Sequence, residues 1–166
     1  FVRKQVAQGH QVYIVCPAVD QEDPEGLKAA EQYGRQLQEE VFPDLRVGIV
    51  HGKQKARDKQ GVMAAFAAGE VDVLVSTTVI EVGVDVPNAA AIVVENAERF
   101  GLSQLHQLRG RVGRGTHQSY CILISDTQND ETRQRLKVMT QTTDGFRIAE
   151  EDLRLRGPGD FFGARQ

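Results

Sequence analysis

The chain has 166 residues, 40% of them hydrophobic, which is enough for one ordinary domain with a buried core. Its formal net charge of −3 argues against a domain that holds nucleic acid through bulk positive charge, so any such contact must be local. No apolar run approaches the roughly 20 residues that cross a membrane, and no signal-peptide pattern is present, so we expect a cytoplasmic protein without membrane contact. Because it opens on Phe1 instead of Met, we expect a piece of a longer protein.

The first half of the chain alternates apolar strands with helices. The strands are rich in β-branched residues and lack polar alternation, as expected of strands buried on both faces. A proline near the start of the first long helix and Pro43 after its end delimit that helix. The expected elements are a strand over 11–16, a helix over 24–41, a strand over 46–50, a helix over 57–68 and a strand over 71–76.

The alternation continues with strands over 91–95 and 119–125, separated by an arginine-bearing segment near 103–114 that we expect to be helical. Strands that alternate with helices in this way predict an α/β fold, with a mostly parallel sheet covered by helices on both faces.

Past Asp126 the pattern changes. We expect a helix to about residue 140, a turn at Asp144 and Gly145, and a second helix over 146–155, which together predict a helical hairpin. The last residues are too rich in Gly and Pro to be regular. We therefore divide the chain into a sheet domain, 1–126, and an appended hairpin and loop, 127–166.

The cysteine and histidine residues give no indication of a metal site. Cys16 and Cys121 each lie in an apolar strand-like run, so we expect buried, reduced thiols instead of a disulfide or a metal pair. The four histidines show no metal-ligand spacing.

Residues 104–115 concentrate positive charge, because Arg109, Arg111 and Arg114 occur there without an acidic residue. On a helix Arg111 and Arg114 would share a face and could present two guanidinium groups to one polyanion. Two glycines in a short helix cost about 1 kcal/mol each relative to alanine, so we expect a partner to approach this backbone closely. A solvated basic turn is the plain alternative.

The spacing of Gln107, Gly110, Arg111 and Arg114, Q-x-x-G-R-x-x-R, resembles motif VI of the superfamily 2 helicases and translocases. The resemblance implies a RecA-like domain whose catalytic residues, Arg111 and Arg114, reach the γ-phosphate of ATP bound mainly by another RecA-like domain. It also places Gln107 at the nucleotide. An arginine on a transferring phosphoryl group contributes about 10³ to 10⁵ in rate.

Residues 76–87 follow the carboxyl end of an expected parallel strand, where open α/β sheets place their ligands. The segment resembles motif V of the same superfamily, in which a Thr, a Gly and an Asp recur at the spacing of Thr77, Gly83 and Asp85. The resemblance implies that Thr77 contacts the nucleic-acid backbone, whereas Gly83 and Asp85 lie beside the nucleotide. An ordinary loop is the alternative.

Gly52 and Lys53 lie between an expected strand and an expected helix. Free amides at a helix N-terminus bind anions, so a DNA phosphate is a natural ligand for Gly52 and Lys53. The alternative is an ordinary loop with solvated lysines.

The final segment, from Asp144 to Gln166, resembles the translocation motif that the RecG family of branched-DNA translocases shares with transcription-repair coupling factors. In that motif a hairpin and loop couple ATP-driven closure of two RecA-like domains to DNA movement, and Arg156 and Gln166 match loop residues. A disordered tail is the alternative for these last residues. The sequence Gly157-Pro-Gly-Asp160 favours the RecG family over the coupling factors.

That resemblance implies the second motor domain of an ATP-dependent helicase that remodels stalled replication forks and recombination junctions in DNA repair. Its partners would be branched duplex DNA, such as forks and Holliday junctions, and the first RecA-like domain and N-terminal wedge domain of the same protein. The setting would be the bacterial cytoplasm, at the nucleoid.

The chain lacks a phosphate-binding loop, because Gly52-Lys53 is followed by Gln54, and it has no D-E-x-H or D-E-x-D segment for Mg²⁺. We therefore expect ATP and Mg²⁺ to be held mainly by a domain outside this chain, and the isolated fragment to be inactive. Two alternatives from other classes are a non-catalytic nucleic-acid-binding module and a small-molecule α/β enzyme that uses the loop around Thr77.

Overall fold

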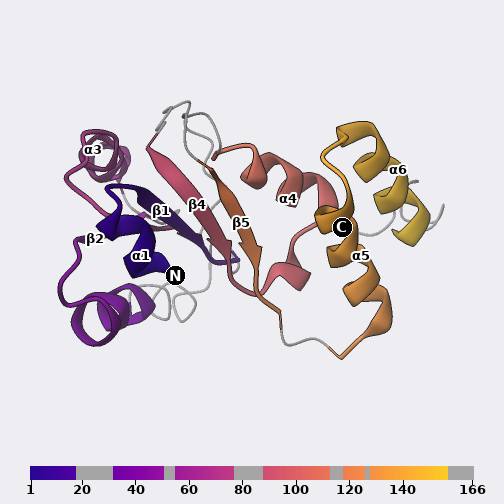
Figure 1. Cartoon of the computed structure of the whole chain (residues 1–166), viewed down its shortest axis with the longest axis horizontal. Helices are drawn as coiled ribbons and strands as arrows, with labels where there is room; N and C mark the ends of the chain where they lie inside the picture. Colours follow the sequence, from indigo (N-terminus) through magenta and orange to yellow (C-terminus); the bar gives the residue numbers. More distant parts are fainter. Residues whose placement is uncertain (18–31, 51–54, 77–87, 113–117, 126–127, 157–166) are drawn as a thin grey trace.

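The computed structural model describes residues 1–17, 32–50, 55–76, 88–112, 118–125 and 128–156. Within them, five strands form one sheet in the order β2-β3-β1-β4-β5, and every neighbouring pair is parallel (Figure 1). The strands are β1 (Gln11–Val15), β2 (Val47–Val50), β3 (Val73–Ser76), β4 (Ala89–Val94) and β5 (Tyr120–Leu123). The predicted α/β class is thereby confirmed.

The inner and outer strands of the sheet differ in how far they are buried. Every residue of β1, β3 and β4 is buried, and these are the three inner strands. The outer strands β2 and β5 are mostly half-buried. Continuous Val, Ile and Ala runs suit strands that are covered on both faces, which explains why the apolar runs gave the strand positions to within two residues.

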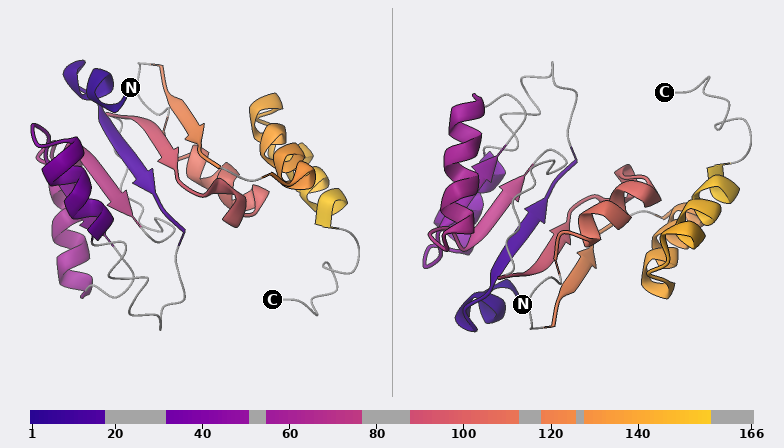
Figure 2. Two further views of the ribbon diagram at one scale, coloured as in Figure 1. Left: turned by 90° about the horizontal axis from the view of Figure 1, so that it is seen from below. Right: turned by 90° about the horizontal axis from the view of Figure 1, so that it is seen from above.

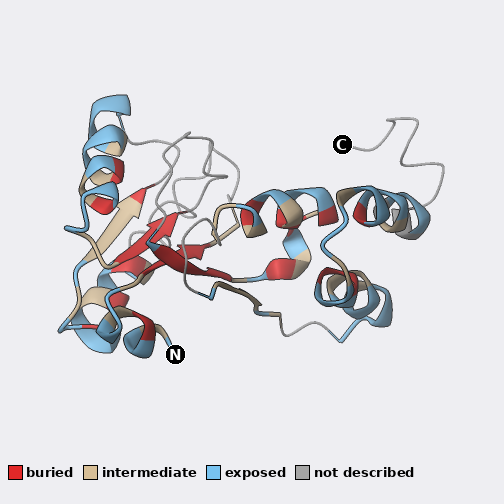
Figure 3. Cartoon of the chain, turned by 45° about the horizontal axis from the view of Figure 1, so that its top comes forward, coloured by how far each residue is buried: buried red, intermediate tan, exposed pale blue. Residues whose placement is uncertain are grey.

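Helices cover both faces of the sheet. The described helical elements are α1 (Val2–Ala7), η1 (Leu37–Val41), α3 (Ala56–Ala67), η2 (Ala97–Arg99), α4 (Leu102–Arg109), α5 (Asp130–Gln141) and α6 (Gly145–Arg156). Tyr13 and Val15 of β1 belong to a buried cluster with α3 and α4. Val12 and Ile14, on the opposite face of the same strand, pack with η1 and α1. Figure 3 shows this buried interior between exposed outer helix faces.

The helix expected over 24–41 is described from residue 32 onward and ends in the π-helical turn η1. Gly34 lets it lie close to β2, because a Cβ at Gly34 would clash with the Ile49 side chain. Phe42 follows the helix and is buried against the sheet. The start of this helix lies outside the described residues.

The two C-terminal helices form the expected hairpin, α5 and α6, with three residues between them. Asn129 caps α5, because its side-chain oxygen accepts hydrogen bonds from the backbone N–H groups of Glu131 (2.9 Å) and Thr132 (3.2 Å). The hairpin lies beyond α4, far from β2 (Figure 2). Val138, Met139 and Ile148 belong to the same buried cluster as α4 and one sheet face, so the hairpin packs firmly on the sheet domain.

One expected element is wrong in its extent. The arginine-bearing helix was expected near 103–114, whereas α4 ends at Arg109 with Gly110 as its C-cap. Glycine is the poorest helix former after proline, and the repeated glycines that follow Arg109 favour a turn over a further helical turn. Among the described helices, none is both long enough and apolar enough to span a membrane.

Candidate nucleotide and nucleic-acid interface

The arginine-bearing segment is anchored by the apolar face of α4. Leu102, Leu105 and Leu108 recur at helical spacing and are almost completely buried in the main cluster. At the helix start, the Gln104 side chain accepts a hydrogen bond of 3.0 Å from the backbone N–H of Gly101. The opposite face, which carries Gln107, is exposed, so Gln107 is available to a partner.

Arg111 lies in a turn beyond the helix, not on a helix face as the spacing suggested. Its backbone N–H bonds to the carbonyl of Leu108 at 3.0 Å, which tightens the chain after α4. Arg111 is half-buried, and Val112 packs against the main cluster. Arg114 lies outside the described residues, so its placement relative to Arg111 stays a prediction.

Arg109, the last residue of α4, joins that helix to the hairpin. Its Nη1 donates to the carbonyl oxygens of Met139 (2.7 Å) and Thr142 (3.0 Å), at the end of α5. Its Nη2 lies 2.9 Å from Nδ1 of His106, one turn earlier on α4. The guanidinium therefore satisfies carbonyls that the end of α5 leaves without intrahelical partners.

His106 also lies at the contact between α4 and the hairpin, close to the start of α6. A Cβ built on Gly145, the first residue of α6, would lie 3.1 Å from Nε2 of His106. Such a contact is closer than ordinary van der Waals separation, so the absence of a side chain at Gly145 lets the start of α6 approach α4. In the middle of α5, Arg135 Nη2 donates to the carbonyl oxygen of Glu98 in η2. α5 is thus held at its C-terminal end and at its middle.

The carboxyl edge of the sheet carries the second candidate surface. Val50 and Ser76, the last residues of β2 and β3, are register partners in neighbouring strands. The segments that contain Gly52 and Lys53, and Thr77, therefore leave the sheet from adjacent positions. Parallel strands place their ligand-binding loops at this edge.

Three polar side chains meet at the same edge, where β1 and β4 end. The Tyr33 hydroxyl donates a hydrogen bond of 3.0 Å to Oε1 of Glu95. Burial, followed by the charge of Glu95, raises the pKa of Cys16 to about 11, and burial together with the Glu95 hydrogen bond raises the pKa of Tyr33. The thiol is therefore protonated and unreactive at neutral pH. Both cysteines are free and half-buried, whereas buried thiols were expected.

Most of the predicted site residues lie outside the described part of the chain: Gly52, Lys53, Thr77, Gly83, Asp85, Arg114 and Gln166. Arg156 is the last residue of α6. The structure places Gln107 and Arg111 together at the end of α4, and their roles stay predictions.

Sequence reasoning missed Arg109 and His106 as residues that join α4 to the hairpin. The signal in the sequence was weak, since Arg109 stands beside two other arginines and only the fold shows that it faces α5. The contact depends on where Met139 and Thr142 come to lie, some 30 residues later in the chain.

The described residues supply groups for an anionic ligand better than for a metal ion. Within the part of the chain that the structure describes, no group of three or more His, Cys, Asp or Glu residues could hold a metal. Arg111 follows α4, whose last turn carries the exposed Gln107, and a guanidinium is a group that binds anions.

Comparison with known proteins identifies the family. The helicase conserved C-terminal domain family matches residues 1–116. The chain is 56% identical to the ATP-dependent DNA helicase RecG of Synechocystis over 165 residues, which are 99% of this chain. It is 51% identical to the ATP-dependent DNA helicase RecG of Thermotoga maritima over 166 residues, which are 100% of this chain.

A solved structure of RecG bound to a three-way DNA junction is 49% identical and superposes with a TM-score of 0.80 over 97% of this chain and 21% of that one. The chain spans about a fifth of the length of these relatives, 20% and 21% of the two helicases. The resemblance to superfamily 2 and to the RecG helicases, first indicated by the motifs, is confirmed. The chain belongs to the helicase conserved C-terminal domain family, and in sequence and fold it is similar to that domain of the RecG helicases.

Proposed function

We propose that this chain is the second RecA-like motor domain, with its translocation hairpin, of an ATP-dependent branched-DNA translocase of the RecG type. The intact protein would remodel stalled replication forks and recombination junctions in DNA repair. It would act at the nucleoid in the bacterial cytoplasm, on forks and Holliday junctions. The division into a motor domain, 1–126, and a translocation segment, 127–166, belongs to this proposal.

In the nucleotide role, Arg111 and Arg114 would stabilise the charge that develops on the transferred phosphoryl group. Gln107, Gly83 and Asp85 would border the same nucleotide. ATP and Mg²⁺ would be held mainly by the first RecA-like domain, and Mg²⁺ supplies charge neutralisation at the phosphates when bound. The exposed position of Gln107 and the anchored end of α4 support this assignment.

In the DNA role, Gly52, Lys53 and Thr77 would contact the phosphate backbone at the carboxyl edge of the sheet. Backbone amides and a hydroxyl can hold phosphates without sequence preference, as a translocase requires. The pairing of Val50 with Ser76 supports a single contact surface, because both segments begin from adjacent strands. A first RecA-like domain and a wedge domain of the same protein would complete the DNA channel.

In the coupling role, the hairpin would transmit movement of the arginine-bearing segment to the DNA through Arg156 and Gln166. The observation that carries the proposal is the joint at Arg109. A residue two positions before Arg111 donates to two carbonyl oxygens at the end of α5, so displacement of α4 must displace the hairpin. A non-catalytic binding module would have no need of this connection.

The experiment that tests the proposal is ATP turnover by the intact protein with no DNA, with linear duplex and with a model replication fork. We expect strong stimulation by the fork over the linear duplex. Equal turnover on both DNAs would favour a translocase that ignores branching. An absence of ATP turnover on every DNA would favour the alternative of a non-catalytic nucleic-acid-binding module.

A further inference from the structure

The chain leaves β4 through a tight turn at the carboxyl edge of the sheet. Asn96, the second residue after β4, has φ 49° and ψ 51°, and no other described residue except glycine has a positive φ. Asparagine tolerates this left-handed conformation better than most side chains do. Residues held in rare backbone conformations cluster at binding and active sites, so the turn is a candidate for a further contact.

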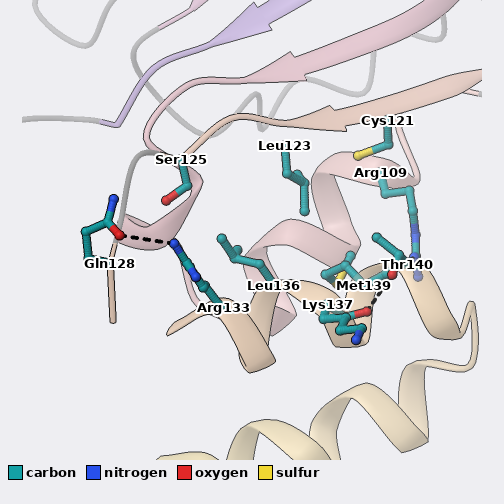
Figure 4. A pocket seen from close by; sticks show the side chains of 10 residues that line it. All are labelled: Arg109, Cys121, Leu123, Ser125, Gln128, Arg133, Leu136, Lys137, Met139 and Thr140. Atoms are coloured by element: carbon teal, nitrogen blue, oxygen red, sulfur yellow. Dashed lines mark hydrogen bonds between the residues drawn. The ribbon is translucent and has the colours of Figure 1, made fainter. Parts of the chain in front are cut away.

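Hydrogen bonds on both sides fix the backbone of this turn. Before it, the backbone N–H of Glu95 donates to the last carbonyl oxygen of β1 at 2.8 Å. After it, the N–H of Ala97 donates at 2.9 Å to the carbonyl oxygen of Ile124. Figure 4 shows the next residue, Ser125, where the chain leaves β5. The conformation of Asn96 is therefore determined by the strands on either side of β4.

The turn presents one amide and one guanidinium to solvent. Asn96 and Arg99 are exposed, and the N–H of Arg99 closes the turn by donating to the carbonyl oxygen of Asn96 at 3.0 Å. Both carboxylate residues of this segment, Glu95 and Glu98, are half-buried, and Oε2 of Glu98 is fully buried. Positive charge is therefore more accessible here than negative charge, although the chain as a whole carries −3.

The turn leaves the sheet at the edge where the proposed DNA contacts begin. Val15, at the end of β1, is the register partner of Ser76 in β3 on one side and of Val94 in β4 on the other. Neighbouring strands lie about 4.8 Å apart, so the ends of β3 and β4 are separated by about 10 Å. The segment that begins at Thr77 and the turn after β4 therefore start close together.

We propose that Asn96 and Arg99 bind a phosphate of the DNA backbone and extend the contact surface assigned to the segments after β2 and β3. Amide and guanidinium groups donate hydrogen bonds to phosphate oxygens, and such contacts position a protein on DNA without reading its sequence. The αL backbone of Asn96 directs the turn outward from the edge, and its neighbours hold it there. This inference rests on the proposed DNA role of the carboxyl edge.

The test is binding of a fluorescein-labelled model fork to the intact protein, followed by anisotropy at several salt concentrations. Each protein–phosphate contact contributes about 0.9 to the slope of log affinity against log salt. Arg99→Gln should lower the affinity about fivefold at low salt and reduce that slope by about 0.9. The control Lys4→Gln removes one charge from exposed α1, which leads into the opposite end of β1, and should change neither quantity.

Two substitutions separate the side chain of Asn96 from its backbone. Asn96→Gly adopts the left-handed conformation readily but lacks the amide, and it should weaken fork binding about twofold. Asn96→Asp keeps the shape and places a negative charge against the phosphate, so it should weaken binding about fivefold or more. The melting temperature of each variant reports whether it is folded.

Two results would overturn the inference while leaving the proposed DNA role of the edge in place. One is an unchanged salt slope and affinity in Arg99→Gln, and the other is an Asn96→Asp variant that binds the fork as tightly as the wild type. An intact wild-type protein that shows no salt-dependent fork binding would contradict the proposed function itself, and this inference with it.

Discussion

Arg109 Nη1 donates a hydrogen bond of 2.7 Å to the carbonyl oxygen of Met139, which ties the last residue of α4 to the end of α5. The bond is partly buried and is accompanied by a second one to Thr142. A guanidinium can serve both carbonyls and His106 at once because its donors are fixed in one plane. The segment proposed to sense ATP and the hairpin proposed to move DNA therefore share a rigid joint.

The buried side of α6 should contribute most of the free energy that holds α6 against α4 and the sheet. Ile148 is 1% exposed and packs in the main cluster, whereas Phe146, two residues earlier, is 84% exposed. Ile148→Ala should lower the free energy of opening of α6 by about 2–5 kcal/mol, through lost packing and a cavity. Phe146→Ala should change it by less than about 0.5 kcal/mol. Amide hydrogen exchange of the intact protein measures both, and equal effects would contradict the assigned packing.

The two arginines after α4 should matter for turnover more than for DNA binding. Arg114→Ala in the intact protein should reduce ATP turnover about a hundredfold or more, because transition-state charge loses a guanidinium. DNA affinity should stay within about twofold of the wild type, since the phosphate contacts are assigned to other segments. Steady-state kinetics measures the ATP turnover, and a fork-binding titration measures the DNA affinity. Equal losses in both would refute this division of roles.

Alkaline pH should destabilise the fold through Cys16. Its folded pKa of about 11 lies above the ordinary value of about 8.5, so its contribution to stability is complete below pH 8.5 and is lost as pH rises towards 11. The melting temperature should therefore fall across this range, and Cys16→Ala should reduce the fall. Iodoacetamide should modify Cys16 slowly at pH 8. Rapid alkylation of the folded protein would show that the thiol is not held in its protonated form.

The 166-residue chain by itself should not turn over ATP. Its sequence has no phosphate-binding loop, and its described residues include no cluster of three or more His, Cys, Asp or Glu side chains that could hold a metal ion. We expect turnover by the isolated chain to be indistinguishable from buffer, with and without fork DNA. Turnover that disappears in an Arg111→Ala variant of the same fragment would contradict the expectation, because a contaminating ATPase would not respond to that substitution.

The sequence was most informative where local composition decides structure. The largely apolar runs over 11–16 and 91–95 predicted strands, which the structure places at Gln11–Val15 and Ala89–Val94. Such composition suits strands that are covered on both faces. The turn expected at Asp144 and Gly145 likewise indicated the hairpin, although Gly145 is already the first residue of α6. The end of α4 was predicted wrongly. Arg111 and Arg114 are three residues apart, which fits one face of a helix, but the glycines around them favour a turn.

The joint itself could not be predicted from the sequence. Arg109 and Met139 are separated by 30 residues, and their contact depends on how α5 packs on α4. The strand order is another such property, because β1 lies between β3 and β4 only through crossovers that local patterns do not specify. Motif resemblance predicted which residues lie near the ligands, and packing showed how one of those segments is connected to the hairpin.

The most direct test of the account is the number of base pairs opened per ATP hydrolysed, compared between the intact protein and its Arg109→Lys variant. Lysine keeps the charge but lacks the planar fork that spans Met139, Thr142 and His106. We predict turnover within about threefold of wild type and a loss of about fivefold or more in base pairs per ATP. Arg133→Lys, on the same hairpin but bonded to Gln128, is the control and should change neither quantity. An unchanged ratio in the Arg109→Lys variant would contradict a role for this joint in coupling.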